Sequence, residues 1–487
     1  MRRPLREWRA RGRTAVAVGA VVCAGSSGAL ALPATTAAGA ADAADAVNPY
    51  VYAKGAENVP SASNSTDAPR LRTGGTSRSS LGAGTSGAAY YRVELDRAAN
   101  AYVSVVAVPP LGSGVRATYS DGISVTLQDR NGARCDSERA TFRSGGYPRP
   151  VTATVERLVR PGALRCQTAG TYYVVVERKT GADSTRETWG LELKVATEPG
   201  LVSPAPEQGP QTWPSASVRP PTRAGVRRAG GTGFNDAVAL TSGVWTDGVR
   251  PGQSHFYRVP VDWGQQLFVD AELGSSAGDG ARRAVVTGAL DMELYNPARA
   301  SIRAKQASYA GEPTSAAFDP LPPVAYENRR LMRDDQAAMR LAGWYYLRVS
   351  LDPAMASKFG DKASGLTLRI TVDGEARRPP DYVRDPGEFQ VTEEDREAAE
   401  KGEGGAVWEN PALGDDGVGE GGRGLGASGA SGSVGASGSA MSSSSSGSGG
   451  SGGMLLVGVA GIGVGCALVL WLGVWRVVAV RRVRGAS

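Results

Sequence analysis

The segment YYRVELDRAANAYVSVVAV (Tyr90–Val108) returns later in the chain as FYRVPVDWGQQLFVDAEL (Phe256–Leu273), and the two align without a gap. In this alignment Asp96 falls on Asp262. Apolar and polar residues alternate along both segments, which is the pattern of β-strands that bury one face. We therefore expect the two segments to form the same pair of strands in two copies of one domain.

Three more pairs of segments match in the same order, and all of them are strand-like. They are ISVTLQDRNG with LDMELYNPAR (Ile123–Gly132, Leu290–Arg299), AGTYYVVVE with AGWYYLRVS (Ala169–Glu177, Ala342–Ser350), and GLELKV with GLTLRI (Gly190–Val195, Gly365–Ile370). The repeat predicts one domain over residues 70–196 and another over 232–374. Short alternating strands separated by turn residues predict an all-β fold, with two tandem antiparallel β-sandwich domains of the jelly-roll kind.

The motifs YYRVEL, ISVTLQDRNG and AGTYYVVVE resemble the bacterial pre-peptidase C-terminal type of β-sandwich. The resemblance covers both copies and implies an accessory extracellular module that binds or spaces rather than catalyses. Related sandwiches sometimes hold calcium through acidic residues of the middle strand. Here that strand region contains few acidic residues, namely Asp121 and Asp129 in the first copy and Asp291 in the second. The resemblance therefore does not decide whether either copy has a calcium site.

Both ends of the chain carry patterns associated with membranes. An arginine-rich start, an apolar run and the sequence Ala38-Gly39-Ala40 predict a secretory signal peptide over residues 1–40. Residues 454–475 contain no charged side chain, and as a helix they would span a bilayer core of roughly 30 Å. Arginines follow in residues 476–487, which predicts a cytoplasmic tail and an N-terminus outside the cell membrane.

The positive net charge of +6 does not indicate nucleic-acid binding, because it gathers at the two ends. Without the arginines of the signal peptide and the tail, the rest of the chain is slightly acidic. The basic residues therefore predict membrane topology rather than a binding face.

Two segments have the composition of linkers. Residues 197–231 are rich in proline, and residues 375–453 become almost pure glycine, serine and alanine toward their end. We expect the first to separate the domains and the second to form a disordered stalk. Within the stalk, Thr392 and Asp395 form a capping box that predicts a short helix. We expect this helix to be solvated, with docking onto a domain as the alternative.

Two of the four cysteines fall in the predicted signal peptide and membrane span, which leaves Cys135 and Cys166 in the exported region. An oxidising compartment permits a disulfide between them. In the repeat they align on Ile302 and Met339, so we expect a disulfide in the first copy and a hydrophobic contact in the second.

The sequence offers few residues for chemistry. The single histidine, His255, has no nucleophile motif to serve and is expected to be an ordinary residue at the edge of a strand. Asp96 and Asp262 are expected to form turns. Four tryptophans could form a sugar-binding platform but are expected mainly in the core: Trp189, Trp245, Trp263 and Trp344. We expect no catalytic, cofactor-binding or metal-binding residue.

These patterns predict a non-enzymatic binding or scaffolding protein at the cell surface, whose partner is an envelope or extracellular protein. The alternative is a surface protein that binds cell-wall glycan. A third hypothesis is a hydrolase that uses a pair of carboxylates.

Overall fold

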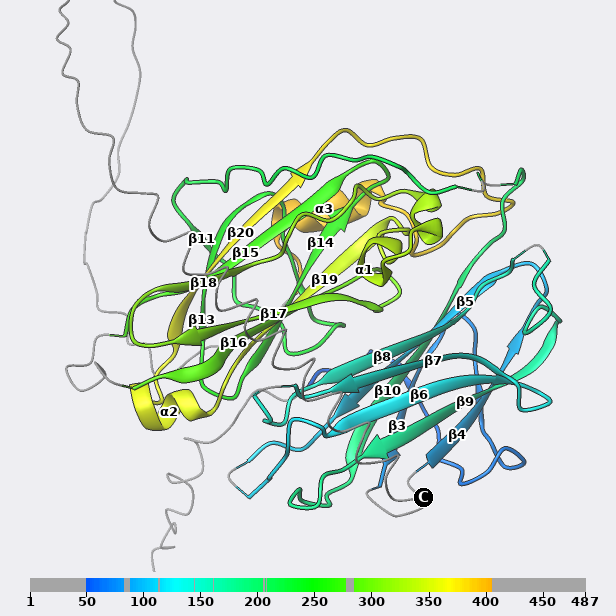
Figure 1. The fold of residues 1–487 in the computed structure, drawn as a ribbon, viewed down its shortest axis with the longest axis horizontal. Coiled ribbons are helices and arrows are strands. Elements are labelled where there is room, and N and C mark those ends of the chain that lie inside the picture. The colour runs from blue at the N-terminus through cyan, green and yellow to red at the C-terminus, as the bar shows by residue number, and fades with distance from the viewer. Residues whose placement is uncertain are drawn as a thin grey trace, which may run out of the picture. The chain divides into compact units, whose positions relative to one another are not determined.

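The computed structural model describes residues 50–404, except for 83–87, 113, 144, 161, 205, 207 and 277–283, and consists mainly of β-strands (Figure 1). The predicted signal peptide, the glycine-rich part of the stalk, the apolar segment 454–475 and the basic tail lie outside the described residues. Among the described residues, no helix is both long and apolar enough to cross a membrane.

The first copy of the repeat forms two five-stranded sheets, with the orders β1-β3-β10-β5-β8 and β2-β4-β9-β6-β7. Without the two-residue strands β1 and β2, the strands β3–β10 follow the order of a jelly roll. We call this body, residues 57–198, the first sandwich. Its strands are β1 (Glu57–Asn58), β2 (Arg70–Leu71), β3 (Thr76–Leu81), β4 (Ala88–Leu95), β5 (Asn100–Val108), β6 (Gly122–Asp129), β7 (Arg134–Thr141), β8 (Val151–Arg157), β9 (Gly170–Lys179) and β10 (Trp189–Glu198).

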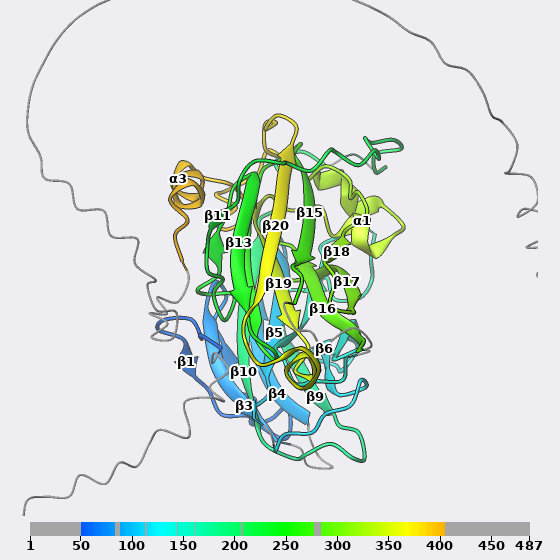
Figure 2. The ribbon, with the colours of Figure 1, turned by 90° about the vertical axis from the view of Figure 1, so that its left-hand side faces the viewer.

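The second copy, residues 226–373, repeats this arrangement and is called the second sandwich. Its sheets have the orders β11-β13-β20-β15-β18 and β12-β14-β19-β16-β17, and Figure 2 shows β13, β20 and β15 side by side. The strands are β11 (Val226–Arg227), β12 (Val238–Ala239), β13 (Gly243–Val249), β14 (Ser254–Val261), β15 (Gln266–Leu273), β16 (Val286–Tyr295), β17 (Ser301–Tyr309), β18 (Thr314–Ala317), β19 (Gly343–Leu351) and β20 (Ser364–Asp373).

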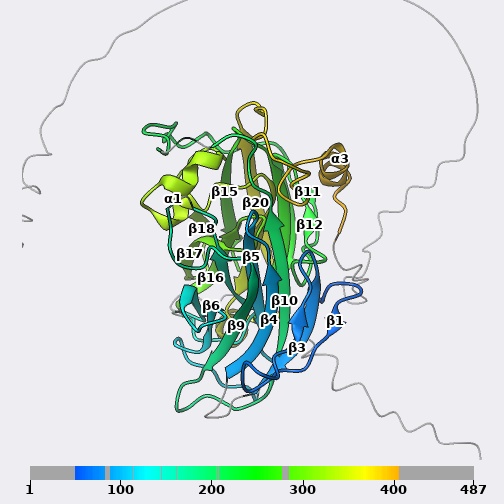
Figure 3. The ribbon, with the colours of Figure 1, turned by 90° about the vertical axis from the view of Figure 1, so that its right-hand side faces the viewer.

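The alternation read from the sequence accounts for the two cores. In β4, Tyr91, Val93 and Leu95 are buried, whereas Arg92 between them is exposed. They pack with residues of the opposite sheet in one apolar cluster, and the second sandwich has a cluster of its own. The expected β class and sandwich arrangement are confirmed, and in Figure 3 β10, β3 and β1 follow one another in sheet order.

The predicted disulfide is confirmed. Cys135 in β7 is bonded to Cys166, which lies in the loop before β9. Ile302 and Met339, their counterparts in the second sandwich, are both buried in its apolar core. A covalent bond in one sandwich thus corresponds to apolar side chains in the other.

Three short helical elements, all in the second sandwich, interrupt the strands: η1 (Tyr326–Arg330), α1 (Asp334–Ala337) and α2 (Ala354–Phe359). η1 and α1 lie between β18 and β19, and α2 connects β19 to β20.

The start of the predicted stalk is folded, which corrects the expectation of disorder from residue 375. We call residues 375–404 the strap. The capping box at Thr392 does begin a helix, α3 (Glu393–Lys401), but the expectation that this helix is solvated is wrong. Ala398 and Ala399 are buried, and α3 packs against β12 and β14. Because small apolar residues line one side of it, the helix can approach the sheet closely.

The disulfide is expected to contribute about 3–4 kcal/mol to the stability of the first sandwich, because the cross-link lowers the conformational entropy of the unfolded chain. We predict that the double substitution C135A/C166A lowers the free energy of unfolding by this amount, measured in urea. Reductant should have the same effect on the wild-type protein and none on the variant. Equal stability of the two proteins without reductant would contradict the prediction.

Candidate functional site

His255, the one histidine, is buried in β14 and belongs to a structural cluster. Its Nδ1 lies 2.6 Å from Oδ2 of Asp247, and the hydroxyl of Tyr257 donates to the same oxygen at 2.6 Å. Burial raises the pKa of Asp247, but the hydrogen bonds from His255, Tyr257 and the amide of Gly230 outweigh it and leave the pKa lowered. His255 thus lies at the entry of its strand as expected, but it is buried there, because the carboxylate of Asp247 is placed to pair with its ring.

The tryptophans are core residues, as expected. Trp189, Trp245 and Trp263 are buried. Trp344 is half-buried, and its Nε1 donates to Oδ1 of Asp395 in the strap at 2.7 Å. None of the four presents an open ring to a sugar.

The two aspartates expected at turns, Asp96 and Asp262, accept hydrogen bonds from backbone amides of their own turns. Asp96 Oδ1 accepts from the amides of Ala98 and Ala99, and Asp262 Oδ1 accepts from the amide of Trp263, which confirms both as turn-formers. Within the described ranges, no group of three or more His, Cys, Asp or Glu is placed to hold a metal ion.

Asp291 joins the two sandwiches. Its side chain is fully buried, with Oδ1 accepting from Arg348 of β19 at 2.7 Å and Oδ2 lying 3.4 Å from Arg149 of the first sandwich. Gln306 donates to Oδ2 at 2.7 Å, and the second nitrogen of Arg348 donates to the carbonyl of Pro150 in the first sandwich at 2.6 Å.

Glu293, two residues along the same strand, also links the sandwiches. It pairs with Arg348 and with Arg143 of the first sandwich.

The charges explain why this carboxylate stays ionised. Burial raises the pKa of Asp291, but the nearby guanidinium groups of Arg149 and Arg348 outweigh burial and lower the pKa to about 2. The two close carboxylates Asp291 and Glu293 are therefore held by arginines, and neither is arranged as a protonated acid for hydrolysis.

A second buried ion pair crosses the interface between the sandwiches, and Tyr50 at the start of the described chain contacts it. Arg299 of the second sandwich donates to Glu192 of β10 at 2.6 Å, and the hydroxyl of Tyr50 donates to the same carboxylate at 3.0 Å. The ring of Tyr50 lies edge-on to Phe256 in an aromatic cluster that also contains Phe234. Residues before the first strand are thus fixed between the sandwiches.

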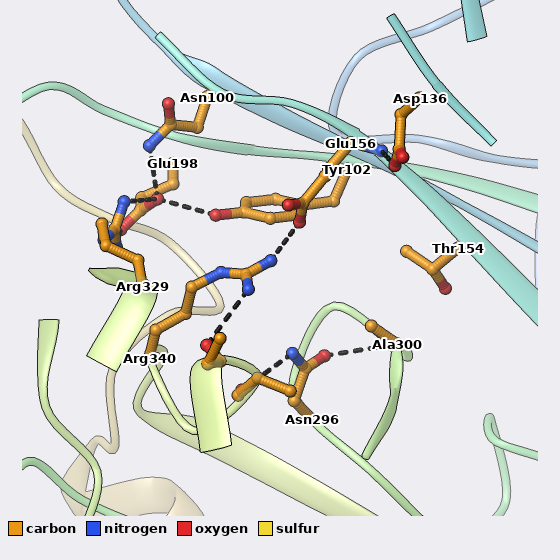
Figure 4. A network of polar contacts seen from close by, with 12 residues as sticks. Asn100, Tyr102, Asp136, Thr154, Glu156, Glu198, Asn296, Ala300, Arg329 and Arg340 are labelled. Atoms are coloured by element: carbon orange, nitrogen blue, oxygen red, sulfur yellow. Dashed lines mark hydrogen bonds and ion pairs between the residues drawn. The ribbon is translucent and has the colours of Figure 1, made fainter. Parts of the chain in front are cut away.

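A third network surrounds Glu198, at the end of β10 (Figure 4). This fully buried carboxylate accepts from Arg329 of η1 at 2.8 Å and from Asn100 and Tyr102 of β5 at 2.7 and 2.9 Å. Arg340 of the second sandwich forms an ion pair with Glu156 of β8 close by.

The strap contacts both sandwiches. Phe389 is fully buried and lies edge-on to Tyr102 of the first sandwich, with ring centres 5.5 Å apart. The hydroxyl of Tyr382 donates to Glu198 at 2.9 Å, and Glu388 pairs with Lys194. At the other end, Arg396 of α3 forms an ion pair of 2.9 Å with Asp262 of the second sandwich. The strap therefore crosses the interface and holds it from outside.

A surface groove of about 1000 Å³ lies on the first sandwich, beside the Arg143 contact. Tyr119, with 70% of its surface exposed, is the aromatic residue in its described lining. The walls are formed by the loop before β6, the end of β7 and the loop that follows, and the lining residues are Ala117, Thr118, Tyr119, Ser120, Arg139, Thr141, Arg143, Gly145 and Gly146.

No family model and no curated protein matches the chain. Among solved structures, the pre-peptidase C-terminal domain of a Bacillus anthracis collagenase is similar at 18% identity and a TM-score of 0.17, over 26% of this chain and 94% of that one. The tandem CBM22 domains of Paenibacillus barcinonensis Xyn10C are similar at 10% identity and a TM-score of 0.17, over 58% and 82%. The ANX1 ectodomain of Arabidopsis thaliana is similar at 9% identity and a TM-score of 0.17, over 65% and 93%. Similarity at this level carries no conclusion about function.

We predict that Asp291→Asn lowers the free energy of unfolding at neutral pH by about 3–5 kcal/mol, because the buried guanidinium of Arg149 loses its counter-charge and that of Arg348 keeps only Glu293. The lowered pKa means that this stabilisation is complete above the ordinary value of 3.8 and is lost as the pH falls toward about 2. The difference between variant and wild type should therefore shrink over that range. Glu177→Ala, which removes an exposed ion pair with Lys179, is the control and should cost less than about 1 kcal/mol.

We predict that Phe389→Ala weakens the strap, because removing a fully buried ring costs about 3–5 kcal/mol. Urea unfolding measures the loss, and limited proteolysis should cut the variant within residues 375–404 before either sandwich. Val383→Ala, in the same segment but 57% exposed, should change stability by no more than about 0.5 kcal/mol. Equal protease resistance of Phe389→Ala and wild type would show that the strap does not depend on this ring.

Proposed function

We propose that this protein is a non-enzymatic binding or scaffolding protein, held at the cell surface by its C-terminal segment. Its two sandwiches form one rigid body whose surfaces bind the partners. The observation that carries the proposal is the set of buried ion pairs between the sandwiches. Asp291 with Arg149, Glu192 with Arg299 and Glu198 with Arg329 all lie in the interior.

Buried ion pairs of this kind favour a fixed orientation over strength of adhesion. Two charges removed from water gain little net free energy when paired, but either one left alone is costly. A sliding or hinging motion between the sandwiches would separate Glu192 from Arg299 and leave both without a counter-charge in the interior. The cost of such a motion keeps the two surfaces in one relative position, which is the property a scaffold needs.

The strap supports a tether at the C-terminal side of this body. The amide of Ala239 in β12 donates to the carbonyl of Glu403 at 2.8 Å, so the chain is held to the second sandwich up to the last residues described. The glycine- and serine-rich segment and the apolar residues 454–475 follow in the sequence. We propose that these form the flexible stalk and the single membrane span, with the sandwiches outside the cell.

The test uses the full-length protein in intact cells, with three measurements: protease access to the sandwiches, recovery in the membrane fraction, and crosslinking to neighbouring envelope proteins. We expect the sandwiches to be cleaved by external protease while the tail stays protected, and the same crosslinked partner to recur. Asp291→Asn should reduce that crosslink at least fivefold, whereas Glu177→Ala should not.

Two outcomes would overturn the proposal. One is a chain that external protease cannot reach or that appears free in the medium. The other is partner crosslinking that is unchanged by Asp291→Asn although the variant unfolds more easily, because a rigid two-sandwich platform would then be unnecessary.

A second candidate, binding of cell-wall glycan, is favoured by the exposed ring of Tyr119 in the groove. Ring faces that remain open to water on a folded surface are common at recognition sites. In this hypothesis the two sandwiches form the same rigid body, and the groove is the site that binds the glycan.

A further inference from the structure

We propose that the groove beside Tyr119 binds an acidic glycan, a chain of sugar rings that carry carboxylate or phosphate groups. The inference rests on the binding role proposed above and names the ligand class for one surface of the first sandwich. It is carried by three features of the groove: an open aromatic ring, the exposed guanidinium group of Arg139, and loops fixed in place.

The ring of Tyr119 is unusual for this protein. Most large apolar side chains described here are buried, and Tyr119 is the single aromatic residue among the large hydrophobic side chains exposed in the described ranges. Its ring has a flat apolar face and a polar hydroxyl, a combination that suits ligands with an apolar face and polar edges. The C–H face of a sugar ring, bordered by hydroxyl groups, has this character.

Arg139 and Arg143 give the groove its charge. Arg139 is exposed on β7, and its Nη2 donates a long hydrogen bond of 3.4 Å to the carbonyl of Ser120. Arg143 shares its charge with Glu293 of the second sandwich. Among the described residues that line the groove none is acidic, and the acid that borders it is Glu293, which pairs with Arg143. A guanidinium with free N–H groups binds carboxylate or phosphate through paired hydrogen bonds, which a neutral sugar does not offer.

The loop that carries Tyr119 is held by a buried carboxylate. Asp121, which is 1% exposed, accepts from the amide and the hydroxyl of Thr118 at 3.2 and 2.7 Å and from the amide of Gly181 at 2.6 Å. Its own carbonyl accepts from the amide of Phe142 at 3.0 Å, which links the loop to the end of β7. The ring is thus presented on a fixed backbone, and a ligand need not order it.

The opposite wall is also shaped closely. Gly146 has a φ of 62°, and a Cβ at this position would lie 3.3 Å from the amide nitrogen of Tyr119. A glycine there permits both the turn and the approach of the two loops. The groove is wide and open, and its volume of about 1000 Å³ leaves room for more than one sugar ring.

The experiment is calorimetric titration of the full-length protein in detergent with two acidic probes, hexagalacturonate for carboxylate and a phosphorylated oligomannose for phosphate. Each probe has a neutral counterpart, the methyl ester and the unphosphorylated sugar. We expect at least one acidic probe to bind at least tenfold more tightly than its neutral counterpart. The arm that binds identifies which acidic group the groove takes.

Variants tie the binding to the groove. Tyr119→Ala and Arg139→Gln should each raise the Kd about tenfold, whereas Tyr119→Phe should leave it within about twofold. Arg134→Gln, at the other end of β7 and also exposed, is the matched control for charge and should change the Kd less than twofold. Thermal unfolding midpoints equal to that of wild type confirm that these surface variants fold.

Three results would overturn the proposal: no binding of either acidic probe, equal affinity for acidic and neutral forms, or equal loss in Arg139→Gln and Arg134→Gln. Tighter binding of single-stranded polyuridylate that also depends on Tyr119 would assign the groove to nucleic acid instead. None of these results touches the rigid scaffold, whose test depends on Asp291 and on access to the cell surface, so the two proposals fail separately.

Discussion

The structure depends on one carboxylate that neutralises cations from both sandwiches. Asp291 lies in the interior between Arg348 of its own sandwich and Arg149 of the other. A buried guanidinium without a counter-charge is among the most costly groups in a folded protein, so Arg149 can be buried only where the first sandwich meets Asp291 in this register. The pairs at Glu192 and Glu198 repeat the constraint elsewhere on the same interface. Two domains that each have a complete core are in this way made into one body.

The segments outside the strands follow from that constraint. Tyr50 completes the hydrogen bonds of Glu192, and Tyr382 in the strap completes those of Glu198. Each adds an aromatic ring that keeps water from the charges beside it, and Phe389 does the same next to Tyr102. A low local dielectric strengthens an ion pair only while water stays out. The segments before and after the repeat therefore serve the same interface, although they are far apart in sequence.

Local patterns made part of this structure predictable. Alternation identified the strands, the internal repeat related the two copies, the spacing of Cys135 and Cys166 indicated the disulfide, and the capping box at Thr392 marked α3. The interface was missed because a charged residue in an alternating strand normally faces water. A comparison of the copies contains the missing signal, since Arg348 aligns on Val175 and Asp291 on Ser124. Charges present in one copy alone mark surfaces that the copies do not use alike, but their partners become visible only in three dimensions. Tyr119 lies in an irregular loop, where no periodicity distinguishes an open ring from a buried one.

The position of the strap has a consequence for the order in which the protein is made. A ribosome delivers Tyr50 early, Phe256 midway and Phe389 near the end of the folded part, yet all three rings close over the same junction. The first sandwich can complete its own core as soon as it emerges, whereas its charged face stays wet until the last of these residues arrives. Nascent chains that end before residue 389 should accordingly contain two folded sandwiches whose interface the strap does not yet cover. Docking of the strap is then a late step in the biogenesis of this protein, separate from the folding of either sandwich.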